Sequence, residues 1–403
     1  MTQTHESHAI GKGAFSMKKI RETNRRWSAA TIGGAAVAAL MGGAAIVAPD
    51  NAASSGDPVS EAAAVVAAHA DSPQFWAPPR IDISSARGKT VWWIGDQSQN
   101  IIQQWAEAGA DAAKLAGLKF HLFDPGSSVA EHVRAFNLAI AAKADAIVLG
   151  DGYPAVAFSA QVADAKKHGI PVFSLVSHPF GADTDPKVDG LVADVSYNYP
   201  EAGKLLADWF VADSKGKGRA LIISLKGIPS GDWQIDGFKD ELKRLGTEAS
   251  YVEASSNFGP SEQTDIINVV STAILRDPTI GYVIPPFDSM ALFAQTGLAQ
   301  LGPAGAKVKT AGFNTILPQM TNLQRGGTPF KIDLGGPNVW LGYAAIDDVL
   351  RALTNQPIIH DYKIGYRIFD HKNVQGLELS KEDDRNWYGI DYGASFKPVW
   401  QLQ

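Results

Sequence analysis

The chain has 403 residues, a formal net charge of −6 at pH 7 and no cysteine. Its length exceeds what one ordinary hydrophobic core holds, so two lobes are expected. The acidic balance, without a long basic patch, argues against a nucleic-acid partner. The lack of cysteine excludes disulfides, thiolate metal sites and a lipid-modified N-terminal cysteine, so the protein is not expected to be a lipoprotein.

The first 53 residues have the layout of an export signal. Met17 serves as an alternative start, basic residues follow it, and Ala29–Val47 is an apolar stretch without a charge. This order is typical of a secretory signal, and Asn24–Ser28 resembles a twin-arginine signal. We predict export to the periplasm or the extracellular space with cleavage of the signal. The cleavage site, the export route and retention of the stretch as a membrane anchor stay open.

Residues 54–88 are rich in Ala, Pro and Ser, a composition that predicts a linker with one short helix at Val59–Ala68. From Lys89 onward, short apolar runs alternate with segments of helical periodicity. The runs lack a clean alternation of apolar and polar residues, which favours parallel strands buried on both faces. The predicted strands are Thr90–Gly95, Lys119–Asp124, Ala146–Gly150, Pro171–Leu175, Arg219–Leu225, Glu248–Glu253, Thr279–Ile284, Val308–Phe313, Phe330–Leu334 and Tyr362–Phe369.

Helices are predicted between most of these strands, which indicates βαβ units. The same rhythm runs twice along the chain, so we expect two similar α/β lobes with a cleft between them. Open α/β sheets bind ligands at the carboxyl ends of their strands, where polar turns occur in this sequence. The predicted helices are Asn100–Ala116, Val129–Lys143, Ala155–Lys167, Gln234–Leu245, Ser261–Leu275, Ser289–Ala299, Pro318–Gln324 and Val339–Leu353.

An ordered set of short motifs resembles the periplasmic solute-binding proteins of the ribose and galactose type, which serve ABC importers. The resemblance spans Lys89 to Gln356 in the order and spacing of that family. Bacterial sugar-responsive repressors share this core, but they carry an N-terminal DNA-binding domain where this chain has an export signal. The motifs are Lys166–Val172, Glu201–Lys204, Gly237–Phe238, Phe287–Leu292 and Gly312–Asn314.

The resemblance implies a type I periplasmic-binding-protein fold, with two Rossmann-like parallel-sheet lobes joined by three hinge crossings. The expected crossings lie near Ser196–Tyr199, Leu334–Pro337 and Asn355–Ile358. Lobe 1 would contain residues 89–197 and 337–356, and lobe 2 would contain residues 198–336. Residues 357–403 form an aromatic-rich C-terminal extension, which is expected to pack on the lobes.

The sequence departs from the family at positions that grip sugars. Sugar binders of this type hold hydroxyls with an Asp-Arg pair after the fourth strand, where this chain has Val176 and Ser177. Ile101 and Ile102 replace a pair of phenylalanines at the start of the first helix. Because an unpaired buried polar group costs about 1–3 kcal/mol, these losses argue against an ordinary monosaccharide bound in the usual way.

Three further positions differ from the family pattern. Phe287 replaces an Asn, Asn314 replaces an Asp, and an arginine upstream of Gly237 is replaced by Gln234 or Trp233. The predicted ligand is a sugar, sugar derivative, polyol or ring compound, because the candidate residues mix amides and carboxylates with aromatic rings. The candidates are Asp96, Gln99, Asp151, Tyr153, Ser177, His178, Asn198, Trp233, Gln234, Phe287, Asp288, Asn314 and Asn338.

Several candidates have a structural alternative. Asp96, Asp151 and Asp288 follow strands and precede helices, where aspartate frequently caps a helix N-terminus. Asp124 precedes Pro125 and Gly126, and we interpret it as a turn residue. The choice between capping and ligand contact stays open for the first three.

No catalytic motif accompanies this pattern. The chain lacks a Gly-x-Ser-x-Gly elbow, a P-loop and a dinucleotide-binding fingerprint, and its nine histidines show no metal-ligand spacing. We therefore expect no metal, no cofactor and no enzymatic activity. The favoured function is an extracytoplasmic, monomeric binding protein that delivers a small molecule to an ABC permease. The alternatives are a sensing subunit that presents the ligand to a membrane receptor, and a secreted α/β enzyme.

Overall fold

The computed structural model describes residues 56–180, 190–379 and 384–402. The predicted export signal lies outside these residues. No helix within the described ranges is both long enough and apolar enough to cross a membrane.

The N-terminal part of the chain forms a five-stranded parallel sheet, sheet A, in the spatial order β2-β1-β3-β4-β5. Its central strands are buried along their length, as expected for a parallel sheet covered on both faces. The strands are β1 (Thr90–Ile94), β2 (Lys119–Phe123), β3 (Ala146–Leu149), β4 (Val172–Leu175) and β5 (Ala193–Val195).

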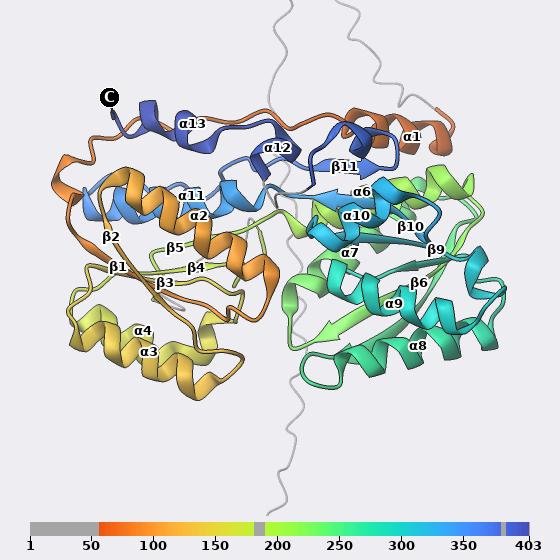
Figure 1. Ribbon diagram of the computed structural model, residues 1–403, viewed down its shortest axis with the longest axis horizontal. Coiled ribbons are helices and arrows are strands. Elements are labelled where there is room, and N and C mark those ends of the chain that lie inside the picture. Colours follow the sequence, from red (N-terminus) through yellow and green to blue (C-terminus); the bar gives the residue numbers. More distant parts are fainter. Residues whose placement is uncertain (1–55, 181–189, 380–383, 403) are drawn as a thin grey trace, which may run out of the picture. The chain divides into compact units, whose positions relative to one another are not determined.

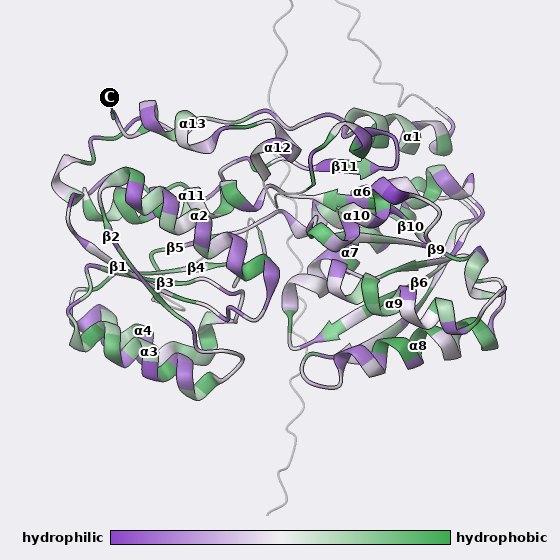
Figure 2. Ribbon diagram, viewed as in Figure 1, coloured by the Kyte–Doolittle hydropathy of each residue, from purple (hydrophilic) through white to green (hydrophobic). Residues whose placement is uncertain are grey.

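Helices cover both faces of sheet A (Figure 1). On one face lie α2 (Asn100–Ala116) and α11 (Asn338–Leu353); on the other lie α3 (Val129–Ala141) and α4 (Ser159–Lys167), which a 3-10 turn at Ala155–Phe158 precedes. Hydrophobic and hydrophilic residues alternate along these helices in Figure 2, as expected for helices that bury one side. This sheet with its helices is lobe 1.

The second half of the chain forms a six-stranded sheet, sheet B, in the order β11-β10-β9-β8-β6-β7. All neighbouring strands are parallel except β10 and β11, which pair antiparallel. The strands are β6 (Arg219–Lys226), β7 (Ser250–Asn257), β8 (Tyr282–Ile284), β9 (Lys309–Phe313), β10 (Phe330–Gly335) and β11 (Arg367–Asp370).

Sheet B is also covered on both faces, and with its helices it forms lobe 2. Apolar side chains of α6 and α7 cover one face, whereas those of α8 and α9 cover the other. The two-sided cover of both sheets confirms the predicted fold class. The helices are α6 (Tyr199–Ser214), α7 (Pro229–Leu245), α8 (Glu262–Arg276), α9 (Asp288–Gln300) and α10 (Leu317–Arg325).

Helices α6 and α7 approach each other closely through two glycines. A Cβ atom on Gly203 would lie 1.8 Å from the main-chain oxygen of Gln234, and one on Gly237 would lie 1.9 Å from that of Pro200. Neither position has room for a side chain. The Gly237–Phe238 motif of the sequence is therefore a packing motif between two helices.

The strand β5 and the helix α6 were not among the predicted elements. β5 spans only three residues, which is too short for a periodicity to emerge. Helix α6 has standard start signals: Asn198 caps it by accepting a hydrogen bond from the Glu201 amide, and Pro200 lies in its first turn.

The chain passes between the two sheets where the hinge crossings are predicted. It leaves sheet A after β5 and enters α6 at Tyr199. It returns from β10 to α11 through Gly336 and Pro337, and it passes from α11 to β11 through residues 354–366. Both sheets belong to the same compact unit of the chain.

Residues 56–88 pack against both lobes, which differs from the linker interpretation. Helix α1 (Pro58–Ala68) covers α6 of lobe 2, and Ile81 and Ile83 are buried near α11 of lobe 1. The ring of Phe75 packs at a tilt against that of Trp340, with 4.9 Å between the ring centroids. A few well-spaced apolar side chains suffice to anchor this segment although its composition is that of a linker.

The C-terminal extension also contacts both lobes, through β11 in sheet B and α13 (Tyr392–Val399) against α11 and α2. The indole of Trp400 donates a hydrogen bond to Asp347 Oδ1 over 2.6 Å. Asp347 also forms a buried ion pair with Arg351 over 2.6 Å. The short helix α12 (Asp384–Tyr388) lies between these two contacts, above the region where the lobes meet in Figure 1.

Candidate ligand-binding site

A cavity of about 110 Å³ lies between the carboxyl ends of the strands of sheets A and B. Its position agrees with the prediction from the polar turns. Residues of both lobes line it: Asp96, Gln99, Ile101, Ile102, Trp105, Asp151, Gly152, Tyr153, Val176, Tyr199, Leu225, Ile228, Ser230, Phe258, Glu262, Phe287, Ser289 and Asn314.

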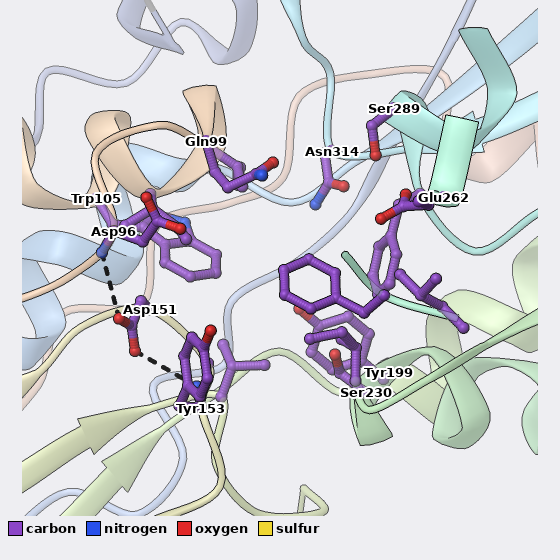
Figure 3. A pocket seen from close by; sticks show the side chains of 18 residues that line it. Asp96, Gln99, Trp105, Asp151, Tyr153, Tyr199, Ser230, Glu262, Ser289 and Asn314 are labelled. Atoms are coloured by element: carbon purple, nitrogen blue, oxygen red, sulfur yellow. Dashed lines mark hydrogen bonds between the residues drawn. The ribbon is translucent and has the colours of Figure 1, made fainter. Parts of the chain in front are cut away.

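On the lobe 1 side, two aspartates follow neighbouring strands and are joined by a hydrogen bond. Asp96 follows β1 and Asp151 follows β3, and the Asp96 amide donates to Asp151 Oδ2 over 3.2 Å (Figure 3). Asp96 Oδ1 accepts from the Ser98 amide over 2.9 Å. Both residues are buried, with exposures of 2% for Asp96 and 7% for Asp151.

A buried histidine holds Asp151 from behind the cavity. His132 of α3 lies with Nε2 2.6 Å from Asp151 Oδ2 and Nδ1 2.8 Å from the main-chain oxygen of Ser128. Both ring nitrogens face acceptors, so both must donate, and we infer that the imidazole is protonated. Burial by itself lowers the pKa of His132, but the hydrogen bond and charge of Asp151 outweigh it, so the pKa is raised.

Tyr153 completes this wall. Its hydroxyl donates to the main-chain oxygen of Ser127 over 3.1 Å, and its ring lies 4.7 Å from that of His132. Burial and the charges of Asp151 and Asp96 raise the pKa of Tyr153, so the hydroxyl remains a hydrogen-bond donor.

Aromatic and hydroxyl-bearing side chains form much of the lobe 2 side of the cavity. Phe287 follows β8, Phe258 follows β7, and Ser230 lies in the first turn of α7. Glu262 begins α8 and is the carboxylate that lobe 2 contributes. Burial raises its pKa. In Figure 3, Glu262 lies on the side of the cavity opposite Asp96.

The loop after β9 presents Asn314 to the cavity in an unusual backbone conformation. Asn314 has φ of 131° and the next residue, Thr315, has φ of 56°. Such positive values cost roughly 1–3 kcal/mol for residues other than glycine and persist where the surroundings impose them. The loop is held by buried carboxyl groups: Asp333 Oδ1 accepts from the Thr315 amide, and Asp288 Oδ2 accepts from the Ile316 amide.

Asp288 and Asp333 form a completely buried pair beneath this loop. Burial raises the pKa of both groups, and the negative charge of Asp288 raises that of Asp333 further. Two neighbouring buried carboxyl groups cannot both ionise at low cost, so one of the pair is expected to keep its proton. Asp288 therefore supports the site from below and does not line the cavity.

The structure brings part of the predicted set to the cavity. Asp96, Gln99, Asp151, Tyr153, Phe287 and Asn314 line it. Their contact with a ligand stays a prediction. Asp124 is a turn residue, since its Oδ1 accepts from the amides of Gln97 and Gly126.

The other predicted residues lie around the cavity in structural roles. The amides of Ser177 and His178 both donate to Asp194. Asn198 caps α6, and the ring of Trp233 lies 6.3 Å from that of Tyr199.

Two more predicted residues are buried in packed interfaces. Gln234 is 2% exposed and lies beside Phe238 at the contact of α6 with α7. Asn338 is fully buried at the start of α11, where it accepts a hydrogen bond from the Tyr197 hydroxyl over 2.9 Å.

Sequence reasoning missed His132, Trp105, Tyr199, Ser230, Phe258, Glu262 and Ser289. Most of these lie at the starts of helices that follow strands, so the strand-end rule could have included them. Trp105 and His132 lie inside helices, where no local signal distinguishes a site residue from a packing residue. Within the described ranges, no group of three or more His, Asp or Glu residues is placed to hold a metal ion.

Two doubly wound lobes with a cavity between the carboxyl ends of their strands define the class of two-lobed α/β ligand-binding folds. The chain belongs to the periplasmic binding protein domain family, which matches residues 91–357. This match confirms the predicted family. No curated protein sequence matches the chain.

Solved structures of similar fold include ABC transporter solute-binding proteins. One from Agrobacterium vitis, with bound allitol, has a TM-score of 0.62 and 20% identity over 72% of this chain and 97% of its own. One from Actinobacillus succinogenes, with bound D-allose, has a TM-score of 0.62 and 20% identity over 72% of this chain and 100% of its own. One from Bacillus halodurans, with bound myo-inositol, has a TM-score of 0.60 and 17% identity, covering 72% and 96%.

Proposed function

We propose that this protein is an extracytoplasmic solute-binding protein that captures a small polar ring compound or polyol between its lobes. The observation that carries the proposal is the cavity itself, since the carboxyl ends of both sheets contribute residues to it. A ligand held by Asp96 and Asp151 on one side and by Ser230 and Asn314 on the other would stabilise the closed arrangement of the lobes.

Sugars and polyols are the ligand class that the lining supports. Carboxylates and amides hydrogen-bond hydroxyl groups, while Trp105 and Phe287 offer apolar surfaces for the C–H face of a ring. The chain also has the same fold as solved proteins with bound allitol, D-allose and myo-inositol, which supports the same ligand class for it. Binding without catalysis is part of the proposal.

Export and delivery complete the proposed function. The N-terminal signal would place the protein outside the cytoplasm, where it would act as a monomer that presents its ligand to an ABC permease. A deletion strain tests this step: uptake of the ligand should be lost, and the gene for the intact protein should restore it. Normal uptake with loss of a ligand-induced signal would favour the sensing alternative.

Ligand capture can be tested by thermal unfolding of the protein with allitol, D-allose, myo-inositol and common hexoses. A ligand at 100 times its Kd should stabilise the native state by about 2.7 kcal/mol and raise Tm in a dose-dependent way. A second test uses the lack of cysteine: single cysteines at the exposed positions Val156 and Leu275 label one lobe each. The ligand should shorten the distance between the two labels, and an unchanged distance at saturation would contradict closure.

A further inference from the structure

The charges that line the cavity have one sign. Asp96, Asp151 and Glu262 are acidic, and none of the described residues that line the cavity is Lys, Arg or His. His132 compensates Asp151, because the two side chains form a buried ion pair over 2.6 Å. Asp96 and Glu262 form no ion pair with a described residue. The charge of His132 also acts on Asp96, but the three carboxylates outnumber this one cation, so the cavity walls keep a net negative charge.

The carboxylate of Asp96 can accept a hydrogen bond from a group in the cavity. Its side chain is almost completely buried, Oδ1 accepts from Ser98, and no described residue donates a hydrogen bond to Oδ2. A ligand group that donates to Oδ2 from the cavity would add a charge-assisted hydrogen bond and contribute binding free energy. Glu262 faces the cavity from lobe 2 with its own desolvated carboxyl group.

We propose that the natural ligand carries a protonated amine on a hydroxylated ring, as amino sugars and aminocyclitols do. This inference rests on the proposed binding function and narrows its ligand class. An ammonium group donates three hydrogen bonds and accepts none, which matches a lining that holds three carboxylates and whose donor-only side chain, Trp105, already donates to Asn338 Oδ1. Its bonds to Asp96 and Glu262 are charge-assisted and stronger than those of a hydroxyl.

The negative charges of Asp96 and Glu262 make closure of the lobes depend on the charge of the ligand. Because Asp96 belongs to lobe 1 and Glu262 to lobe 2, closure brings like charges toward each other in a cavity with aromatic walls. A cation between them turns this repulsion into attraction, and the rings of Phe258 and Phe287 can add cation–π contacts. Anionic ligands such as sugar acids are repelled by the same two groups.

Calorimetric titration of the full-length protein with matched ligands tests this inference. The sets are D-galactosamine, D-galactose and D-galacturonate; D-glucosamine, D-glucose and D-glucuronate; and 2-deoxystreptamine with myo-inositol. In at least one set the amine should bind about tenfold or more tightly than its neutral counterpart, and the acids should bind weakest.

Two conservative variants test whether the carboxylates of Asp96 and Glu262 cause the preference for amines. Glu262→Gln and Asp96→Asn keep the shape and an acceptor oxygen but remove the charge. Each should weaken binding of the amine about tenfold more than it weakens binding of the neutral counterpart, so the preference for the amine should shrink. Glu107→Gln, on the exposed side of α2 and outside the cavity lining, is the matched control and should change neither.

The outcomes separate the two proposals. If neutral ligands bind as tightly as the amines in every set, the amine inference is wrong and the binding function stands. If amines bind but Glu262→Gln and Asp96→Asn leave the preference intact, the assigned carboxylates are wrong. If no compound binds, both the inference and the proposed sugar-type ligand are overturned.

Discussion

Asn338 Nδ2 donates a hydrogen bond to the main-chain oxygen of Asn314 over 3.2 Å. Asn338 begins α11 of lobe 1, whereas Asn314 follows β9 of lobe 2 and lines the cavity in a conformation that favours glycine. The same amide nitrogen donates to Gln104 Oε1 over 2.8 Å. One buried side chain therefore joins the lobes next to the ligand site.

Replacing Asn338 with Asp tests this connection. The variant keeps the size of the side chain but turns the Nδ2 donor into an oxygen that faces the Asn314 carbonyl. We expect the free energy of unfolding in urea to fall by about 2 kcal/mol, because a buried acceptor loses its donor and meets a charge. Affinity for any ligand of the cavity should fall as well. Asn137→Asp on the exposed side of α3 is the control, and equal stability of the two variants would contradict the prediction.

Truncation of His132 should leave Asp151 buried without its cation. His132→Ala is expected to lower the free energy of unfolding by about 3 kcal/mol, as for other broken buried ion pairs. Chemical denaturation of the variant measures this loss. His168→Ala is the matched control, since His168 is exposed and its ion pair with Asp164 lies at the surface.

The His132 contribution also has a defined pH dependence. Because the folded-state pKa of His132 is raised, its stabilisation is complete below the unfolded pKa of about 6.5. It is lost as pH rises through the folded pKa. The stability difference between wild type and His132→Ala should therefore shrink as the pH rises above about 6.5, and a constant difference would refute the assigned protonation.

Asp333→Asn should reduce the loss of stability that the wild type shows as pH rises above about 4. Burial raises the folded pKa of Asp333, so the pair it forms with Asp288 is most stable at a pH below the unfolded value of about 3.9. Its contribution is lost as pH rises through the folded pKa. The amide introduced by the substitution would donate to Asp288 without a titrating proton, so Tm of the variant should fall less steeply above about pH 4. Asp240→Asn, exposed on α7, should keep the wild-type slope.

Gly203→Ala should disrupt the contact of α6 with α7. The new Cβ atom would lie 1.8 Å from the main-chain oxygen of Gln234, so the helices must separate. We expect a loss of about 3 kcal/mol of stability, at the upper end for overpacked cores. Gly376→Ala is the control, because no atom lies within 4 Å of its Cβ position. Similar melting temperatures for both variants would show that the contact can adjust.

The elements of the fold could be predicted mainly where a local pattern was long. Helix Asn100–Ala116 has the predicted bounds because its apolar face repeats over several turns and Gly117 ends it in a left-handed conformation. Strand β5 was missed because three residues carry no period. Residues 56–88 were interpreted as a linker because their anchors, among them Ile81 and Phe75, are separated by proline and polar residues.

The sequence by itself determined that the chain alternates strands and helices twice, that polar turns follow the strands, and which family's motifs it carries. These properties reside in the spacing of neighbouring residues, so they can be read along the chain. Only the tertiary structure decided that His132 supports Asp151, that Asp288 lies beneath the site, and that Glu262 faces Asp96 across it. These contacts join residues that lie far apart in the sequence. They depend on how the packing of the segments orients each side chain, which no local pattern of residues specifies.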